Sequence, residues 1–125
     1  MPSVSEHLEQ AERNESLYSD LCRLYTSVPE YTEWEVVAFF YAALHYVDSW
    51  LAISEDIHPR NHAQRIGLVR NNNALRPISD EYRRLYRMSV LARYEMKHPS
   101  LQETRRIEIN EYASIRQHVR SLLGL

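Results

Sequence analysis

Glycine and cysteine are scarce in this chain of 125 residues. Two glycines, Gly67 and Gly124, offer few of the positive-φ positions that tight hairpins need, and no Asn-Gly or Asp-Gly pair occurs. The single cysteine, Cys22, cannot form an internal disulfide, and no apolar signal segment opens the sequence. These absences argue against a β-rich fold and lead us to expect a cytoplasmic protein.

Long apolar runs and several catalytic motifs are also missing. The longest apolar run, residues 36–44, is far shorter than the roughly 20 residues of a membrane-spanning helix, so no membrane insertion is expected. The chain has no glycine-rich phosphate loop, no Gly-x-Ser-x-Gly elbow and no paired-cysteine motif. His58 and His62 lack the further ligands of a four-ligand zinc site. We therefore predict neither a metal nor a cofactor.

Five prolines divide the chain into segments of helical length. The expected helices cover residues 5–27, 32–54, 61–70, 79–96 and 100–123. Residues 36–51 are apolar on nearly all sides, which predicts that their helix is the central one. The prediction is one all-α domain over residues 1–125, an up-and-down bundle of four to five helices.

Polar residues at the expected helix starts support these boundaries. Thr32 with Glu35, and Ser100 with Glu103, have the spacing of a capping box, in which two side chains satisfy free backbone amides. Ser79 is expected to cap the fourth helix through its hydroxyl. Each cap marks a helix start that follows or lies near a proline.

Charge is distributed very unevenly along the sequence. Residues 1–59 contain eleven acidic and two basic residues, whereas residues 60–106 contain eleven basic and four acidic ones. Such asymmetry favours a surface that binds a polyanion. The alternative is that acidic and basic helices neutralise one another within the bundle or across a dimer.

Two polar stripes lie on the expected helices at helical spacing. Tyr41, His45 and Asp48 share one face of the central helix. Asp48 either orients the His45 imidazole for structure alone or holds it as a general base. Arg93 ends a stripe of tyrosines on the fourth helix, and either forms a structural pair with Asp48 or binds a substrate phosphate.

A third cluster lies where the third helix is expected to begin. His62 and Arg65 are three residues apart and share a helix face, and Arg60 precedes them. A helix N-terminus with such cations is suited to bind phosphate, although surface arginines of this kind commonly only meet solvent.

Arg93 and His98 are separated by four residues at the end of the fourth helix. This spacing, in a helical chain of this length, resembles the HEPN superfamily, as do residues 40–48 and 91–94. The resemblance implies an RNA-binding domain that works as a homodimer and cleaves RNA without a metal. It further implies that Arg93 stabilises the phosphorane charge, that His98 or His45 acts as base, and that the RNA is held by other residues. Those expected substrate-binding residues are Asp48, Arg60, His62, Arg65 and Tyr94.

Two alternatives to a nuclease remain open at the level of sequence. Tyr94 follows Arg93 where nucleases of that superfamily usually have a polar residue, which favours a catalytically silent module. Such a module would bind a nucleotide or a partner protein through the same polar residues. The other alternative is a dimerisation domain in which tyrosines and Trp50 form the interface.

Overall fold

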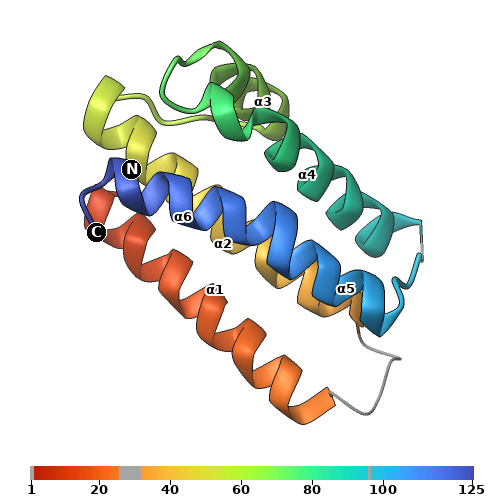
Figure 1. The fold of residues 1–125 in the computed structure, drawn as a ribbon. Coiled ribbons are helices and arrows are strands. Elements are labelled where there is room, and N and C mark those ends of the chain that lie inside the picture. Colours follow the sequence, from red (N-terminus) through yellow and green to blue (C-terminus); the bar gives the residue numbers. More distant parts are fainter. Residues whose placement is uncertain (1, 26–31, 96) are drawn as a thin grey trace.

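The computed structural model describes residues 2–25, 32–95 and 97–125, and these residues form a bundle of helices (Figure 1). The α-helices are α1 (Val4–Tyr25), α2 (Thr32–Glu55), α3 (His62–Asn71), α4 (Ser79–Tyr94), α5 (Leu101–Ile107) and α6 (Ala113–Leu122). A short 3₁₀ turn, Arg76–Ile78, precedes α4, and a π turn, Glu108–Tyr112, joins α5 to α6. The described ranges contain no strand, so the predicted all-α fold is confirmed.

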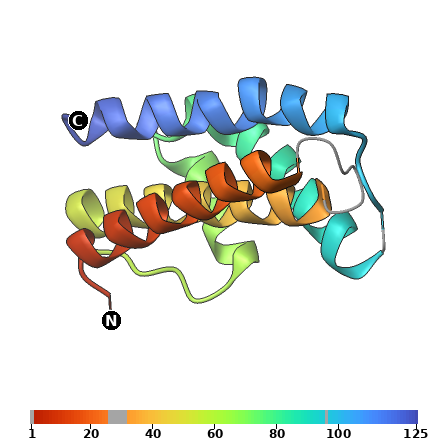
Figure 2. The same cartoon turned by 90° about the horizontal axis from the view of Figure 1, so that it is seen from below.

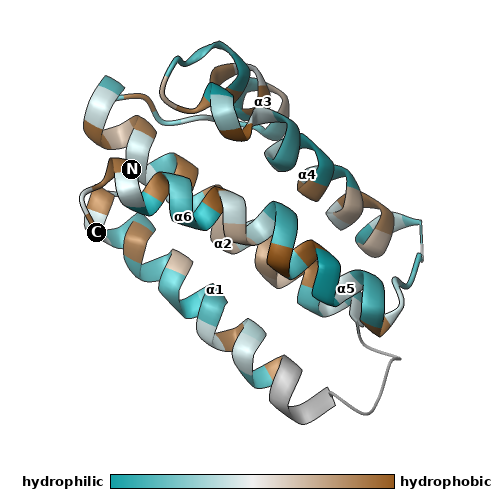
Figure 3. Ribbon diagram, in the orientation of Figure 1, coloured by the Kyte–Doolittle hydropathy of each residue, from teal (hydrophilic) through white to brown (hydrophobic). Residues whose placement is uncertain are grey.

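The long helices alternate in direction along the chain (Figures 1 and 2). α1 and α2 form an antiparallel pair, and α4 and the rod made of α5, the π turn and α6 also pack against α2. The short α3 is inserted in the connection between α2 and α4. Many residues of α1, α4 and α5 are hydrophilic (Figure 3), as expected of helices that surround a central one.

α2 is the central helix, as its apolar sequence predicted. Its Phe39 and Phe40 side chains are fully buried. The Phe39 ring lies 3.8 Å from that of Tyr18 in α1 and 5.0 Å from that of Tyr112 in the π turn. The Phe40 ring lies 5.8 Å from that of Tyr82 in α4. By length and composition α2 could cross a membrane, but 67% of its most apolar stretch is buried inside the bundle, which fits a core helix.

The helix boundaries agree with the sequence to within a few residues, and residues 26, 27 and 96 lie outside the described ranges. The cap at Ser100 is confirmed, because its hydroxyl oxygen accepts a hydrogen bond from the backbone N–H of Glu103 at 3.1 Å. The cap at Ser79 is wrong. Ser79 is the first residue of α4 and makes no capping hydrogen bond, because the preceding 3₁₀ turn leads directly into the helix.

The start of α2 is tied to the segment that leads into α5. The Thr32 hydroxyl donates to the carbonyl of Pro99 at 2.5 Å. Three residues later, the Glu35 carboxylate accepts a hydrogen bond from Arg105 at 2.8 Å. Both side chains of the expected capping box thus make contacts between helices that are far apart in the sequence.

The last helix of the sequence contains an irregular turn. A π turn holds one residue more than an α turn, and therefore rotates the side chains that follow it relative to those that precede it. Tyr112, the last residue of this turn, points inward, and its hydroxyl donates to Glu15 of α1 at 2.6 Å. The predicted helix over residues 100–123 is confirmed as a continuous rod, but nothing in its sequence pattern predicted the π turn.

Candidate functional site

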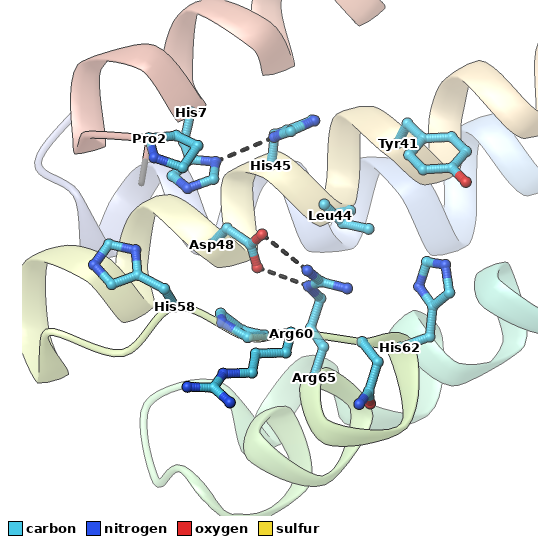
Figure 4. A pocket seen from close by; sticks show the side chains of 12 residues that line it. Pro2, His7, Tyr41, Leu44, His45, Asp48, His58, Arg60, His62 and Arg65 are labelled. Atoms are coloured by element: carbon cyan, nitrogen blue, oxygen red, sulfur yellow. Dashed lines mark hydrogen bonds and ion pairs between the residues drawn. The ribbon is translucent and has the colours of Figure 1, made fainter.

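A cleft of about 670 Å³ lies where α1, α2 and the start of α3 meet (Figure 4). Histidines, arginines and one aspartate line it together with Tyr41. The charged and titratable residues of the cleft are His7, His45, Asp48, His58, Arg60, His62 and Arg65. The structure therefore brings together five of the site residues predicted from the sequence: His45, Asp48, Arg60, His62 and Arg65.

A buried ion pair forms one wall of the cleft. Arg65 of α3 donates to Asp48 of α2 in a bidentate arrangement, with Nε 2.7 Å from Oδ1 and Nη2 3.1 Å from Oδ2. Less than a tenth of either side chain is exposed. The Asp48–Arg93 pair considered from the sequence is wrong, because α3 places Arg65 over Asp48 instead. These donors of Arg65 are thus already occupied by a carboxylate.

Two histidines meet beside this ion pair (Figure 4). Nδ1 of His7 in α1 lies 3.2 Å from Nδ1 of His45 in α2, so that one neutral ring donates and the other accepts. Burial lowers the pKa of both imidazoles, and the neighbouring His7 lowers the pKa of His45 further. His45 is therefore a neutral base at physiological pH. The expectation that Asp48 orients His45 is wrong, since its hydrogen-bond partner is His7.

His62, the first residue of α3, has an aromatic environment. Its ring lies 5.1 Å from the ring of Tyr86 and 5.6 Å from that of Phe40. Burial lowers the pKa of His62, and the positive charges of Arg65 and Arg93 lower it further. A third neutral imidazole therefore stands on the α3 side of the cleft.

The segment before α3 is held by two side-chain hydrogen bonds. The Asn61 side chain caps the helix by accepting from the Gln64 N–H at 2.8 Å. The Gln64 side chain in turn accepts from the backbone N–H of Arg60 at 2.7 Å. These bonds fix the backbone of Arg60 and leave its exposed guanidinium at the mouth of the cleft.

Arg93 of α4 adjoins the cleft through Tyr41. Its Nη1 donates to the Tyr41 hydroxyl at 2.5 Å, while Nε and Nη2 donate to the backbone carbonyl and hydroxyl of Ser89 at 3.3 and 3.2 Å. The guanidinium also lies over the rings of Tyr41 and Tyr94, at 5.3 and 5.0 Å from their centroids. All of these partners are neutral. A guanidinium carries five N–H donors, so Arg93 keeps both its charge and two donors for an anion.

His98, the partner of Arg93 in the sequence motif, lies in a different environment. Nδ1 of His98 is 3.0 Å from Oε2 of Glu33, and more than half of the His98 side chain is exposed. His98 lines a smaller pocket of about 240 Å³ that includes Leu91. In the described residues, no hydrogen bond joins His98 to Arg93. Tyr94 is 72% exposed and does not line the cleft, although its ring lies against the Arg93 guanidinium.

His7 could not be selected from the sequence. It is 6% exposed, and no carboxylate or histidine three or four residues away forms a stripe with it on α1. Tyr41 was recognised as part of the α2 stripe but not as the contact to Arg93. Both assignments need knowledge of which helix faces meet.

Comparisons with known protein families, with curated proteins and with solved structures found no match. Within the described ranges, no group of three or more histidine, cysteine or acidic residues could hold a metal ion. The functional interpretation therefore depends on the geometry of the cleft itself.

Proposed function

We propose that this chain is an RNA-binding domain whose cleft holds a phosphodiester, and that a histidine of the cleft cleaves it without a metal. The observation that carries the proposal is Arg93, a half-buried arginine whose partners among the described residues are all neutral, beside a cleft with neutral imidazoles. The proposal agrees with the HEPN-like interpretation of the sequence in giving Arg93 the phosphate. Of the two bases that the resemblance implies, it assigns proton transfer to His45 in the cleft and not to His98.

Recognition of the phosphate would come from two arginines. A guanidinium binds phosphate through paired N–H donors and stays charged at every physiological pH. Arg93 is held rigid by Tyr41 and Ser89, whereas Arg60 extends from the mouth of the cleft. The basic region 60–106, which contains both arginines, would add long-range attraction for RNA.

The proposed chemistry needs a base, an acid and a stabiliser of negative charge. Neutral His45 would remove the proton of the ribose 2′-hydroxyl, whose oxygen attacks the adjacent phosphorus. The bond from phosphorus to the 5′-oxygen then breaks, and a water molecule would supply the proton that this leaving oxygen needs, while His45 releases to solvent the proton it took. Arg93 would stabilise the charge on the phosphorane. The products are a 2′,3′-cyclic phosphate and a 5′-hydroxyl.

The test is cleavage of a labelled single-stranded RNA by purified protein in excess EDTA. We expect wild-type cleavage to persist, and His45→Gln and Arg93→Ala each to lower the rate by about 100-fold or more. Arg83→Ala is the matched control, because Arg83 is an exposed arginine of α4 that pairs with Asp80 away from the cleft. It should cleave like the wild type.

His98→Ala separates the cleft from the sequence motif. Under our proposal this variant keeps most of its activity, since His98 contacts Glu33 and not the cleft. Full cleavage by His45→Gln together with loss in His98→Ala would refute the cleft as the catalytic site. Folded protein that neither binds nor cleaves RNA at low salt would favour the silent interaction module.

A further inference from the structure

A second groove, between α1 and α2, opens into the cleft. Its volume is about 470 Å³, and Gln10, Asn14 and Leu17 of α1 line it opposite Trp34 of α2. Tyr41 and His45 line both the groove and the cleft. The groove is therefore a continuation of the cleft along the α1–α2 pair.

The lining of the groove differs chemically from that of the cleft. None of its described lining residues is an acid, an arginine or a lysine, and more than half of the Trp34 side chain is exposed. The Gln10 Nε2 donates to the Asn14 Oδ1 at 3.1 Å. This bond leaves the Gln10 carbonyl oxygen and the Asn14 amide N–H groups side by side as acceptor and donor. An exposed indole with an adjacent acceptor and donor suits a planar ligand with a polar edge.

From these contacts we infer that the groove binds the bases of single-stranded RNA whose phosphate occupies the cleft. A base would stack on the Trp34 indole, and the Gln10–Asn14 amides would bond to its polar edge. The inference rests on the proposed function and adds a substrate class to it. The uncharged groove suits neutral bases, while Arg60 lines the cleft into which the groove opens and Arg93 donates to Tyr41, which lines both.

The dimensions of the groove agree with a strand rather than a mononucleotide. Trp34 and His45 are eleven residues apart in α2, which corresponds to about 16 Å along the helix axis. A strand with one phosphate near His45 would thus carry a neighbouring base toward Trp34. Duplex RNA cannot use the groove in this way, because its bases are stacked and paired inside the helix.

Fluorescence of Trp34 tests the inference directly. The chain has two tryptophans, and Trp50→Phe leaves Trp34 as the reporter. The probes are a uridine octamer and an abasic octamer with the same number of phosphates, both with methylated 2′-oxygens so that they cannot be cleaved, and anisotropy of a label on each measures binding. We expect the uridine octamer to quench Trp34 and the abasic octamer to bind more weakly and leave the emission unchanged.

Substitutions in the groove should show whether binding depends on the bases or on the phosphates of the probe. Trp34→Ala should weaken binding of the uridine octamer roughly tenfold, and binding of the abasic octamer little, because a stacked base contributes the difference. Trp34→Phe should restore part of the loss. Ile53→Ala is the matched control, since Ile53 is an equally exposed apolar residue at the other end of α2.

Three outcomes would overturn the inference, and they are distinguishable. Equal binding of both octamers by the wild type removes the base site and leaves the phosphate cleft intact. Binding of neither octamer removes the proposed function and the base site together. If sedimentation shows that Trp34→Ala turns a dimer into a monomer without changing base-dependent binding, the groove is an interface between two copies of the chain.

Discussion

Two polar clusters inside the bundle differ in how completely their members satisfy one another. Around Glu15 of α1, the hydroxyls of Tyr46 and Tyr112 and an arginine of α6 all donate to the same carboxylate. At the cleft, within the part of the chain that the structure describes, the partners of Arg93 are all neutral and the buried Nδ1 of His62 has no hydrogen-bond partner. We call the first cluster complete because its carboxylate and its arginine neutralise each other, whereas the charge of Arg93 has no counter-charge among the described residues.

Only the incomplete cluster needs a function to explain it. Buried polar groups are normally hydrogen-bonded, and a fully bonded network is sufficiently explained by the stability and specificity it gives the fold. Groups left incomplete lower stability, so their presence calls for a ligand or a reaction. The Glu15 cluster is therefore structural, and the cleft is the candidate site.

The largest expected loss of stability follows from breaking the Asp48–Arg65 pair. Asp48→Ala leaves the Arg65 guanidinium buried without a counter-ion, which should cost about 3–5 kcal/mol of unfolding free energy in urea denaturation. The control Asp80→Ala removes an exposed carboxylate 3.6 Å from Arg83 and should cost less than about 1 kcal/mol. Similar losses of unfolding free energy in the two variants would mean that water hydrates the Arg65 guanidinium once the Asp48 carboxylate is removed.

A smaller loss is expected from the complete cluster. Glu15→Ala removes the acceptor of two buried tyrosine hydroxyls and should cost about 2 kcal/mol. Glu12→Ala, an exposed glutamate in the same helix, should change stability by less than about 0.5 kcal/mol. In a double-mutant cycle, Tyr112→Phe should lower the unfolding free energy less in the Glu15→Ala background than in the wild type. Additive effects would argue against a network.

The histidine pair should make stability depend on pH. Burial lowers the pKa of His7 and His45 below the usual 6.5, so the unfolded chain takes up protons before the folded one as pH falls. Stability is therefore fully present above about pH 6.5 and declines below it, until the folded imidazoles are protonated as well. Urea midpoints between about pH 7.5 and 5.5 measure this decline. The decline of stability with falling pH should be shallower in the His7→Gln/His45→Gln double variant. An unchanged decline would contradict the lowered pKa values of the two histidines.

The fold could be predicted because its signals are local. Prolines, the Ser100 cap and the apolar sequence of α2 each act within a few residues, and together they specify where helices begin, end and face the core. The cap predicted at Ser79 was wrong because a 3₁₀ turn leads directly into α4, and the local sequence pattern did not reveal that turn.

The site could be predicted only in part, because its pairs join different helices. The spacing of His45 and Asp48 within α2 was visible, but their partners, His7 and Arg65, come from α1 and α3. Helical periodicity gives the face of each residue and not the orientation of one helix against another. The π turn that aims Tyr112 at Glu15 was not predicted either, because residues 101–122 contain no proline or glycine that would mark an irregular turn.

The smallest effect on stability is expected for Arg60→Ala. This variant tests whether the cleft, unlike the Glu15 cluster, binds RNA. Its side chain is exposed, so Arg60→Ala should change the unfolding free energy by less than about 0.5 kcal/mol. RNA binding should nevertheless weaken, and the slope of log K against log salt should fall by about one, because one phosphate contact is lost.

Arg87→Ala is the control for that experiment, since Arg87 is an equally exposed arginine on α4 that does not line the cleft. It should leave the slope unchanged if phosphate contacts are confined to the cleft. If both variants lower the slope equally, the general positive charge of residues 60–106 attracts RNA over a broad surface. The cleft would then bind RNA no more strongly than the rest of this basic surface. Only a catalytic role for His45 and Arg93 could still distinguish the cleft from the Glu15 cluster.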